Sequence, residues 1–400
     1  MTWTCSLLSL SLPNQPIRNS PGGASHIETV GTVAAQQTWT DQHESHKMRT
    51  SQGPMDAGAL IAALQSEIDR VLSPYLDKVT DYALVDFPDH SNVGDSAIWL
   101  GEVLYLKNKL GRVPSYVCRY DDWSKDELVR AVPSGPIFIH GGGNFGDLWP
   151  AHQEFRHEIL SNFPDRQIIQ MPQTIHFSST SNLKKASDVI NSHERFVICA
   201  RDLQSLEVAK GSFRSPVYLC PDMAFCLGPQ VRRERVTREL LLLLRTDLER
   251  NTHELRVPLP EFAVVEDWLE ERRGLGTRLF CKALVQKLFS PNDSATLTPG
   301  VRLRWFQLLA SHRVARGVRQ LASSDYVITD RLHTHILCIL LDMPHTVLDN
   351  NYGKISGFVK AWSRAFEKAT GPIGKLDEAI EAYLATRSAT AKTADAVPAA

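Results

Sequence analysis

The chain has 400 residues, of which 43% are hydrophobic and 22% are charged. These are ordinary values for globular proteins, and they exclude wholesale disorder, a collagen-like repeat and a coiled coil. The 44 lysines and arginines against 45 aspartates and glutamates leave a net charge of -1, so no overall basic field points to a nucleic-acid partner.

The two ends of the chain are predicted to lie outside the fold. Residues 1–54 are rich in Ser, Thr, Gln, Pro and Gly and show no helical or strand period. Their apolar LLSLSL run lacks the basic region that precedes it in a secretory signal. We therefore expect a disordered segment, with Met55 as a plausible start of the protein. Residues 387–400, rich in Ala and Thr, are expected to form a flexible tail.

Strands and helices alternate between these ends. Apolar residues at helical spacing predict an opening helix over residues 60–75. The strands expected in residues 55–230 are 82–87, 116–119, 137–140, 167–171, 196–200 and 217–220. The helices expected there are 97–110, 124–132, 151–162, 182–192 and one from residue 202.

A charged stretch at residues 229–238 interrupts the alternation of strands and helices, which resumes after it. The second domain is expected to span residues 231–386. The elements expected in this second half are strands 239–245, 262–265, 326–329 and 346–348 and helices 279–289, 303–321, 332–341 and 355–366. The alternation predicts an α/β fold of two doubly wound, Rossmann-like domains that join near residues 228–238. Ligands bind beyond the carboxyl ends of such strands, so residues that follow strands are the site candidates.

Two glycine-containing loops follow strands of the first half. The segment after the third strand, HGGGNFGD, places Gly142, Gly143 and Asn144 where backbone N–H groups can approach an anion closely. Its GxGxxG spacing lacks the acidic residue of a dinucleotide site, and a tight strand-to-helix turn is the alternative. In the loop after the first strand, Asn92 caps a helix or binds a ligand, and Asp95 is a candidate hydrogen-bonding or proton-accepting group.

The segment that follows the strand at 326–329 carries the most chemistry. Arg331, Leu332 and His333 begin a helix, where a cation and an imidazole oppose the helix dipole unless an anion is bound. Arg331 can clamp phosphate or carboxylate through two hydrogen bonds, and His333 is placed for proton transfer. A zinc site fails because His335 faces elsewhere and no third ligand follows; we expect no metal.

Two more arginines stand at strand ends. Arg201 and Arg245 each precede an aspartate within two residues, so each either pairs with that aspartate to hold a loop or helps to hold a multiply charged anion.

The order and spacing of several segments over residues 80–370 resemble the polysaccharide pyruvyl transferase family. The matching segments are NVGDSAI (92–98), HGGGNFGDLW (140–149), PQTIHF (172–177), ARD (200–202), PDMAF (221–225), LLRTDLE (243–249), TDRLHTHILCILLDMP (329–344) and LDNNYGKISGF (348–358). The resemblance implies two Rossmann-like domains in a GT-B-like arrangement. It also implies transfer of a pyruvyl group from phosphoenolpyruvate to a sugar hydroxyl, usually as a ketal, on a glycan or its lipid-linked precursor in (exo)polysaccharide biosynthesis.

The resemblance also suggests roles for single residues. His333 would be the acid that protonates the donor methylene or assists phosphate departure, and Asp95 the base for the acceptor hydroxyl. If His333 is only an anion ligand, His140 and His176 are the next candidates for the proton. Asn351, in DNNYGK, is a further substrate-binding candidate. No cofactor beyond the donor substrate and no metal is expected.

Two other functions and one surface stay open. A nucleotide-sugar glycosyltransferase of GT-B architecture is the alternative enzyme, and a glycan-binding or scaffold protein is the non-enzymatic alternative. The arginine-rich helix at 303–321 is either a solvated basic face or a docking face for anionic lipid at the inner side of the plasma membrane.

The seven cysteines form no CxxC pair, which favours a reducing, cytoplasmic compartment.

Overall fold

The structure, a computed structural model, describes residues 53–247, 258–288, 297–349 and 353–395. All of these residues belong to one compact unit. The predicted disordered segment falls on residues 1–54, of which 1–52 lie outside the described residues, as does Asn351. Two separate sheets organise the fold, and every strand pair within them is parallel, which confirms the predicted α/β class.

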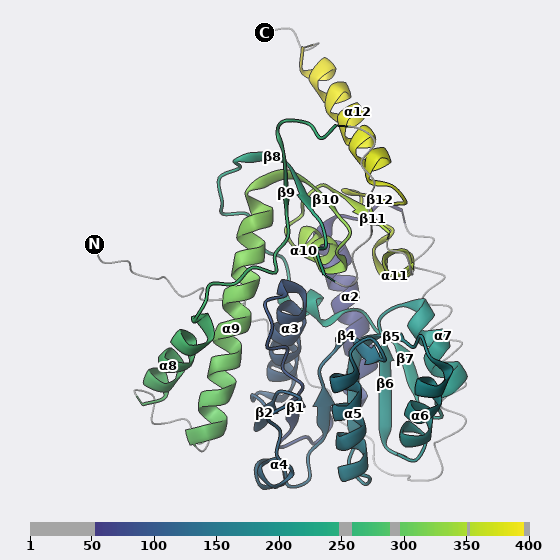
Figure 1. Ribbon diagram of the computed structural model, residues 1–400, viewed down its shortest axis with the longest axis vertical. Coiled ribbons are helices and arrows are strands. Elements are labelled where there is room, and N and C mark those ends of the chain that lie inside the picture. Colours follow the sequence, from purple (N-terminus) through teal and green to yellow (C-terminus); the bar gives the residue numbers. More distant parts are fainter. Residues whose placement is uncertain (1–52, 248–257, 289–296, 350–352, 396–400) are drawn as a thin grey trace, which may run out of the picture. The chain divides into compact units, whose positions relative to one another are not determined.

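The first sheet is built from the first half of the chain (Figure 1). Its strands are β1 (Ala83–Val85), β2 (Tyr116–Cys118), β3 (Ile137–Ile139), β4 (Gly142–Gly146), β5 (Ile168–His176), β6 (Phe196–Ala200) and β7 (Val217–Leu219). Its helices are α2 (Ala57–Leu72), α3 (Val93–Leu110), α4 (Lys125–Ala131), α5 (Pro150–Asn162), α6 (Thr180–Ile190), α7 (Leu203–Ser212) and the short helix η2 (Met223–Leu227). Most strand residues are fully buried, as expected for parallel strands covered on both faces.

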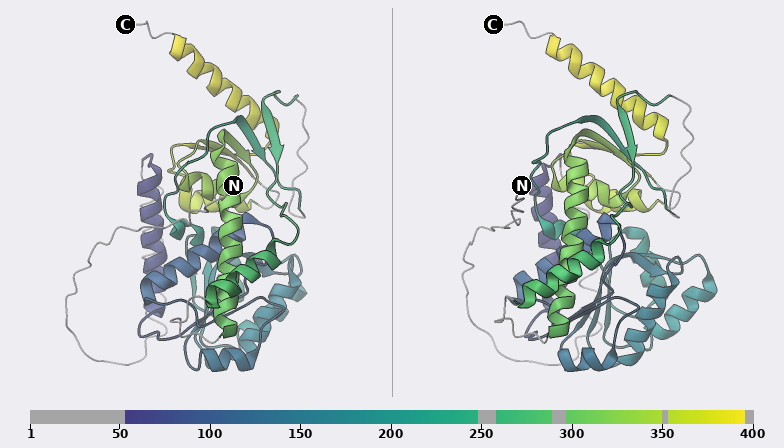
Figure 2. Two further views of the ribbon diagram at one scale, coloured as in Figure 1. Left: turned by 90° about the vertical axis from the view of Figure 1, so that its left-hand side faces the viewer. Right: turned by 60° about the vertical axis from the view of Figure 1, so that its left-hand side comes forward.

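The second sheet follows the same plan. Its strands are β8 (Arg238–Leu243), β9 (Ala263–Glu266), β10 (Ser324–Thr329), β11 (His345–Leu348) and β12 (Ala369–Ile373). Its helices are α8 (Leu275–Leu288), α9 (Leu297–Ala322), α10 (Leu332–Leu340), α11 (Lys354–Phe358), a π-helical turn at Val359–Ser363 and α12 (Leu376–Asp395). Figure 2 shows the long helix α9 extending from this sheet along the first half, where it contacts α3 and β2.

The two sheets have the same strand order. The first runs β2-β1-β3-β5-β6-β7, with β4 attached to β5, and the second runs β9-β8-β10-β11-β12. In each, the second strand along the chain lies outside the first, and the later strands extend in the opposite direction. The loops after β1 and β3, and those after β8 and β10, therefore diverge at a topological switch point, the position at which doubly wound sheets bind ligands.

The two halves share one hydrophobic core cluster. It includes Leu84 of strand β1 and Leu241 of strand β8. Between the two halves, the rings of Phe87 and Phe306 stack with their centroids 4.0 Å apart. The start of the described fold also reaches the second half. Met55 N donates to Ala365 O at 2.7 Å, and α2 contacts α10.

The structure differs from the predicted elements in four places. The glycine segment is strand β4, not a loop, and the PQTIHF segment completes strand β5, because β5 pairs first with β3 and then with β4. Strand β12 was not predicted. Helix α12 continues to Asp395, past residue 387 where the flexible tail was expected, and residues 396–400 lie outside the described residues.

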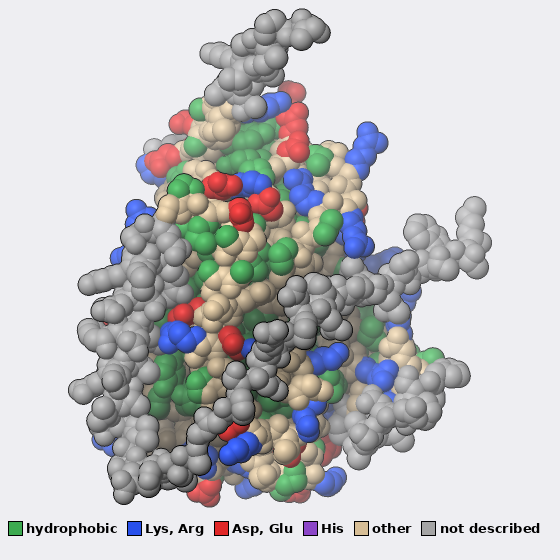
Figure 3. All heavy atoms as spheres, turned by 180° about the vertical axis from the view of Figure 1, so that it is seen from behind, with side chains coloured by type: hydrophobic (Ala, Val, Ile, Leu, Met, Phe, Trp, Pro, Cys, Tyr) green, Lys and Arg blue, Asp and Glu red, His purple; other side chains and the backbone are tan. Residues whose placement is uncertain are grey.

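The cysteines, the helix lengths and the surface charge of the described residues add three observations. The described cysteines are free thiols, mostly buried. None of the described helices is both long and apolar enough to cross a bilayer. On the face seen in Figure 3, basic and acidic side chains both occur between apolar and polar surface, in keeping with the net charge of -1.

Candidate active site

One cavity of about 320 Å³ lies where the switch points of both sheets meet, and its volume is in the range of small-molecule sites. The lining residues predicted from the sequence are Asn92, Asp95, His140, Gly143, Asn144, Arg201, Arg245, Arg331, Leu332 and His333. The lining residues that the sequence did not single out include His90, Trp149, His152, Trp268 and Leu269.

The loop after β1 places Asp95 at the start of α3. Asn92 is the N-cap of this helix, with its Oδ1 accepting from Gly94 N at 3.1 Å and its Nδ2 donating to Asp95 Oδ2 at 2.8 Å. Burial alone would raise the pKa of Asp95, but His90 and His333 hold it below its usual value. Asp95 is therefore an ionised carboxylate, better suited to accept a hydrogen bond than a proton.

Helix α3 approaches His333 so closely that only glycine fits at residue 94. A Cβ at Gly94 would overlap the His333 ring. The His333 ring therefore lies between the first turn of α3 and the side chains of Arg201 and Asp222. Residues from both halves of the chain fix its position.

Arg201, Asp222 and His333 form a buried cluster opposite this contact. Asp222 Oδ2 accepts from Arg201 Nη1 at 2.8 Å and lies 3.3 Å from His333 Nε2, and the two nitrogens are 3.4 Å apart. Arg201 Nε donates to Thr174 Oγ1 at 2.9 Å. Burial would raise the pKa of Asp222, but His333 and Arg201 hold it well below its usual value. The cluster joins the end of β6 to the start of α10 around one carboxylate.

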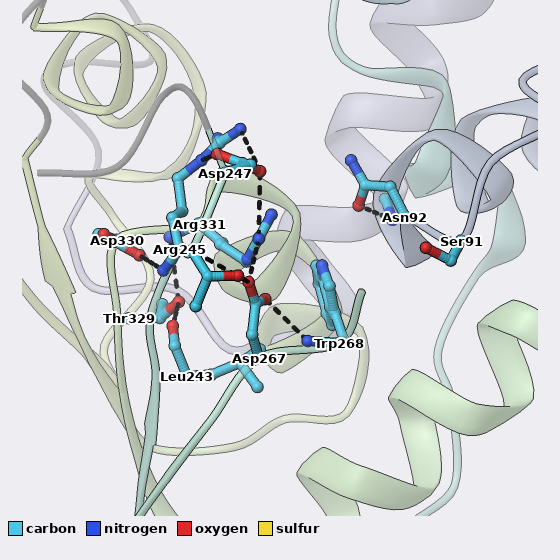
Figure 4. A network of polar contacts seen from close by, with 12 residues as sticks. Ser91, Asn92, Leu243, Arg245, Asp247, Asp267, Trp268, Thr329, Asp330 and Arg331 are labelled. Atoms are coloured by element: carbon cyan, nitrogen blue, oxygen red, sulfur yellow. Dashed lines mark hydrogen bonds and ion pairs between the residues drawn. The ribbon is translucent and has the colours of Figure 1, made fainter. Parts of the chain in front are cut away.

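A second arginine–aspartate network lies at the ends of β8, β9 and β10 (Figure 4). Arg331 Nη2 donates to Asp267 Oδ2 at 2.7 Å and to Asp247 Oδ2 at 3.2 Å. Arg245 Nε donates to Asp247 Oδ1 at 2.8 Å, and the ring of Trp268 lies 5.8 Å from the Arg331 guanidinium. In Figure 4 this network faces Asn92 and Ser91 on the first half of the chain. An anion that binds the Arg331 guanidinium therefore competes with Asp247 and Asp267 for its N–H groups.

A buried carboxylate holds the histidine that precedes the glycines. His140 Nδ1 lies 2.7 Å from Glu102 Oε2, and Gly141 N donates to Glu102 Oε1 at 2.8 Å. Between β3 and β4 the His140 carbonyl accepts from the side-chain amides of Gln170 and Gln173 at 2.9 and 3.1 Å. These bonds satisfy the His140 carbonyl and the Gly141 N–H at the break between the two strands, and His140 lines the cavity.

Asn144 belongs to a further polar network. Its Nδ2 donates to Asp86 Oδ2 at 3.0 Å, and Asp86 Oδ1 lies 2.8 Å from His152 Nδ1. The fully buried Arg156 donates to Asn144 Oδ1 at 3.0 Å, and burial lowers the pKa of Arg156 to about 10. Asp86 has a φ of 72°, a costly backbone conformation for a residue with a Cβ that this network holds in place.

The model of the family described as "Polysaccharide pyruvyl transferase" matches residues 92–352, a range that begins at the N-cap of α3 and includes the cavity residues from Asn92 to His333. The chain belongs to the polysaccharide pyruvyl transferase family. Pyruvyl transferase 1 of Schizosaccharomyces pombe is 32% identical over 310 residues, which cover 72% of this chain and 71% of that protein. EpsO of Bacillus subtilis, named as a candidate pyruvyl transferase, is 30% identical over 314 residues, 77% of this chain and 93% of that one.

A solved structure also aligns with this pyruvyl transferase family member. It is a functionally uncharacterised protein of Klebsiella pneumoniae with a TM-score of 0.49 and 19% identity, and the match covers 77% of this chain and 97% of that chain.

Not all predicted site residues of the family member line the cavity. Gly142 is outside the cavity lining; its φ is 116°, and a Cβ added there would lie 3.3 Å from Asp95 Oδ1. His176 lies at the far end of β5, paired with Gly146, and is outside the cavity lining. Of the two arginines that precede an aspartate, Arg245 does pair with its neighbour Asp247.

Arg201 behaves differently from that expectation. It pairs with Asp222 and not with the adjacent Asp202, which instead caps α7 by accepting from Ser205 N at 2.8 Å. Asp222 was within reach of sequence reasoning, since it follows β7 in the PDMAF segment. Glu102 gave a weaker signal, a lone acid inside the apolar stretch of α3.

The arginine-rich helix α9 serves the cavity walls. Arg316 Nη2 donates to Ser91 O and Trp268 O, each at 2.6 Å. Arg313 is buried, donates to Glu271 Oε1 at 2.8 Å and also reaches Pro88 O at 3.3 Å. These two arginines tie the loop after β1 to the segment after β9, so their side chains serve the fold; docking of α9 on anionic lipid stays a prediction.

Proposed function

We propose that this chain transfers a pyruvyl group from phosphoenolpyruvate to two hydroxyls of a sugar, as a ketal on a glycan or its lipid-linked precursor. We also propose that its two sheets form Rossmann-like domains in a GT-B-like arrangement, joined near residues 228–238. The observation that carries the proposal is the meeting of Arg201, Arg331 and His333 around one cavity. Phosphoenolpyruvate bears about three negative charges, and two arginines with an imidazole match a phosphate beside a carboxylate.

The reaction moves two protons, one from each sugar hydroxyl. Protonation of the donor methylene gives a cation at the carbon that bears the phosphate, and a first hydroxyl adds there. Loss of phosphate and addition of the second hydroxyl complete the ketal. The two hydroxyl protons balance the reaction, because one ends in the new methyl group and the other on hydrogen phosphate.

His333 is the proposed acid for the methylene, since Asp222 and Arg201 hold its ring at the anion side of the cavity. Arg201 and Arg331 bind the donor phosphate and carboxylate. Asp95 accepts a hydrogen bond from the acceptor, because its lowered pKa makes it a weak base.

The experiment is release of inorganic phosphate from phosphoenolpyruvate in the presence of a panel of methyl glycosides with free 4- and 6-hydroxyls. Ketal formation is checked by mass spectrometry, and competition by a nucleoside diphosphate is tested in parallel. We expect acceptor-dependent phosphate release that nucleoside diphosphates do not inhibit. His333→Gln should lower turnover by about 10²–10⁴-fold while phosphoenolpyruvate still binds.

The control is His193→Gln. His193 is also a buried histidine, but its ring nitrogens bond to Phe163 O and Arg195 N away from the cavity. Inhibition by a nucleoside diphosphate without any use of phosphoenolpyruvate would favour a glycosyltransferase and reject the proposal.

A further inference from the structure

The pair formed by Glu102 and His140 has a feature that folding alone does not explain. Both side chains are buried, and Glu102 engages the Nδ1 side of the imidazole at 2.7 Å. The other ring nitrogen, Nε2, is buried and lacks a hydrogen-bond partner in the described part of the chain. A buried polar atom without a partner costs about 1–3 kcal/mol, and His140 is a lining residue of the cavity, so the unpartnered Nε2 points to a group that arrives with the substrate.

We propose that His140 is a second proton-transfer residue of this cavity and that Glu102 is its positioning residue. This inference rests on the proposed function and extends it to the acceptor side. The carboxylate fixes the tautomer in which Nδ1 carries a proton, which leaves Nε2 as the proton acceptor. The same carboxylate stabilises the imidazolium that forms when Nε2 takes up a proton.

The proposed step balances with that of His333. As the first acceptor hydroxyl bonds to the cationic carbon, its O–H bond breaks and the proton moves to His140 Nε2. The imidazolium then gives this proton to the phosphate oxygen as the bond between that oxygen and carbon breaks. The second hydroxyl bonds to the carbon in turn and returns a proton to His333, so both histidines end in their starting states.

The charges around His140 support a base at this position. Burial would lower the pKa of His140, but Glu102, Asp86 and Asp95 raise it above its usual value. Asp95 and Glu102 face it from α3 and Asp86 from the end of β1, while burial lowers the pKa of the nearby His90 and so favours its neutral form, which adds no opposing charge. Asp95, by contrast, has a lowered pKa, so a hydroxyl proton moves more readily to the imidazole.

The experiment compares His140→Gln, Glu102→Gln and the control His193→Gln. We measure phosphate release with the same glycosides, the KM for phosphoenolpyruvate, thermal unfolding and the pH profile of kcat. His140→Gln should lower kcat by about 10²–10⁴-fold with little change in KM. Free imidazole should restore part of the activity of His140→Ala, which keeps the site open.

Glu102→Gln supplies the readout that a purely structural role would not give. In the wild type, activity rises with pH as His140 loses its proton. Without the carboxylate the pKa of His140 falls, so the rising limb of the profile should move to lower pH, with a lower plateau. If Glu102→Gln lowers activity equally at every pH, or if His140→Gln turns over like the control, the inference is wrong. If the wild type itself releases no phosphate, the proposed function fails first.

Discussion

Replacement of Arg331 by alanine tests how the cavity binds its donor. The change removes a cation and also the contacts that Arg331 makes with Asp267 and Asp247 at 2.7 and 3.2 Å, although Asp247 keeps its pair with Arg245. Loss of a charged contact in a closed site costs about 2–4 kcal/mol, or roughly 30- to 1,000-fold in the Kd for phosphoenolpyruvate. Arg331→Lys should recover little, since a point charge does not reproduce the two-pronged contact.

The released carboxylates add to this loss. Asp267 Oδ2 and Asp247 Oδ2 both lie on Arg331 Nη2, at 2.7 and 3.2 Å, so the two oxygens are no more than about 6 Å apart. At that separation two like charges repel by about 3 kcal/mol at an effective dielectric constant of ~20. Asp267→Asn in the Arg331→Ala background should therefore recover binding by roughly tenfold or more. In the wild-type background the same change should bring no such gain, because Arg331 neutralises Asp267 there.

Titration calorimetry with phosphoenolpyruvate measures these affinities, and the exposed Arg319 on α9 offers a matched arginine-to-alanine control away from the cavity. An unchanged Kd in Arg331→Ala would refute the assignment of Arg331 to the donor. A further loss on adding Asp267→Asn would refute the electrostatic reasoning and indicate that Asp267 itself contacts the ligand.

Three other changes follow from the described contacts. Asp222→Asn should destabilise the fold by about 3–5 kcal/mol in urea unfolding, since it leaves the buried Arg201 without its partner. Because the folded pKa of Asp222 is depressed, this stabilisation is complete above the unfolded pKa of ~3.9 and is lost as pH falls below it, so the difference from wild type should shrink on acidification. Gly94→Ala should displace the His333 ring, and we expect kcat to fall while the thermal midpoint changes less. Arg313→Met should lower the unfolding free energy without changing binding to anionic vesicles, whereas loss of vesicle binding alone would support α9 as a lipid-facing helix.

The sequence predicted which loops meet, because strand ends of parallel sheets collect at one edge. The alternation of strands and helices and the strand-end arginines were enough for this. The partners of those arginines were harder to predict. Arg201 pairs with Asp222 from the next strand end and not with its sequence neighbour, and only the strand order shows that these two ends adjoin.

The glycine segment shows a second limit. Its glycines were expected to form a loop, yet residues 142–146 pair with β5, since the hydrogen bonds of Gln170 and Gln173 to His140 O close the gap in the ladder. Such long-range side-chain hydrogen bonds leave no local pattern in the sequence. Glu102 was overlooked for the same reason, because its partner is 38 residues away.

The contact between Met55 and the second half has a consequence for how the protein is made. Met55 leads directly into α2, but its backbone partners are Ala365 and Glu367, and α2 also packs on α10. At about 5–20 residues per second, the ribosome needs roughly 15–60 s to deliver these partners. Throughout that interval the apolar face of α2 is only partly covered. The first half of the chain therefore completes its folding only after the residues of the second half that contact Met55 and α2 have been synthesised.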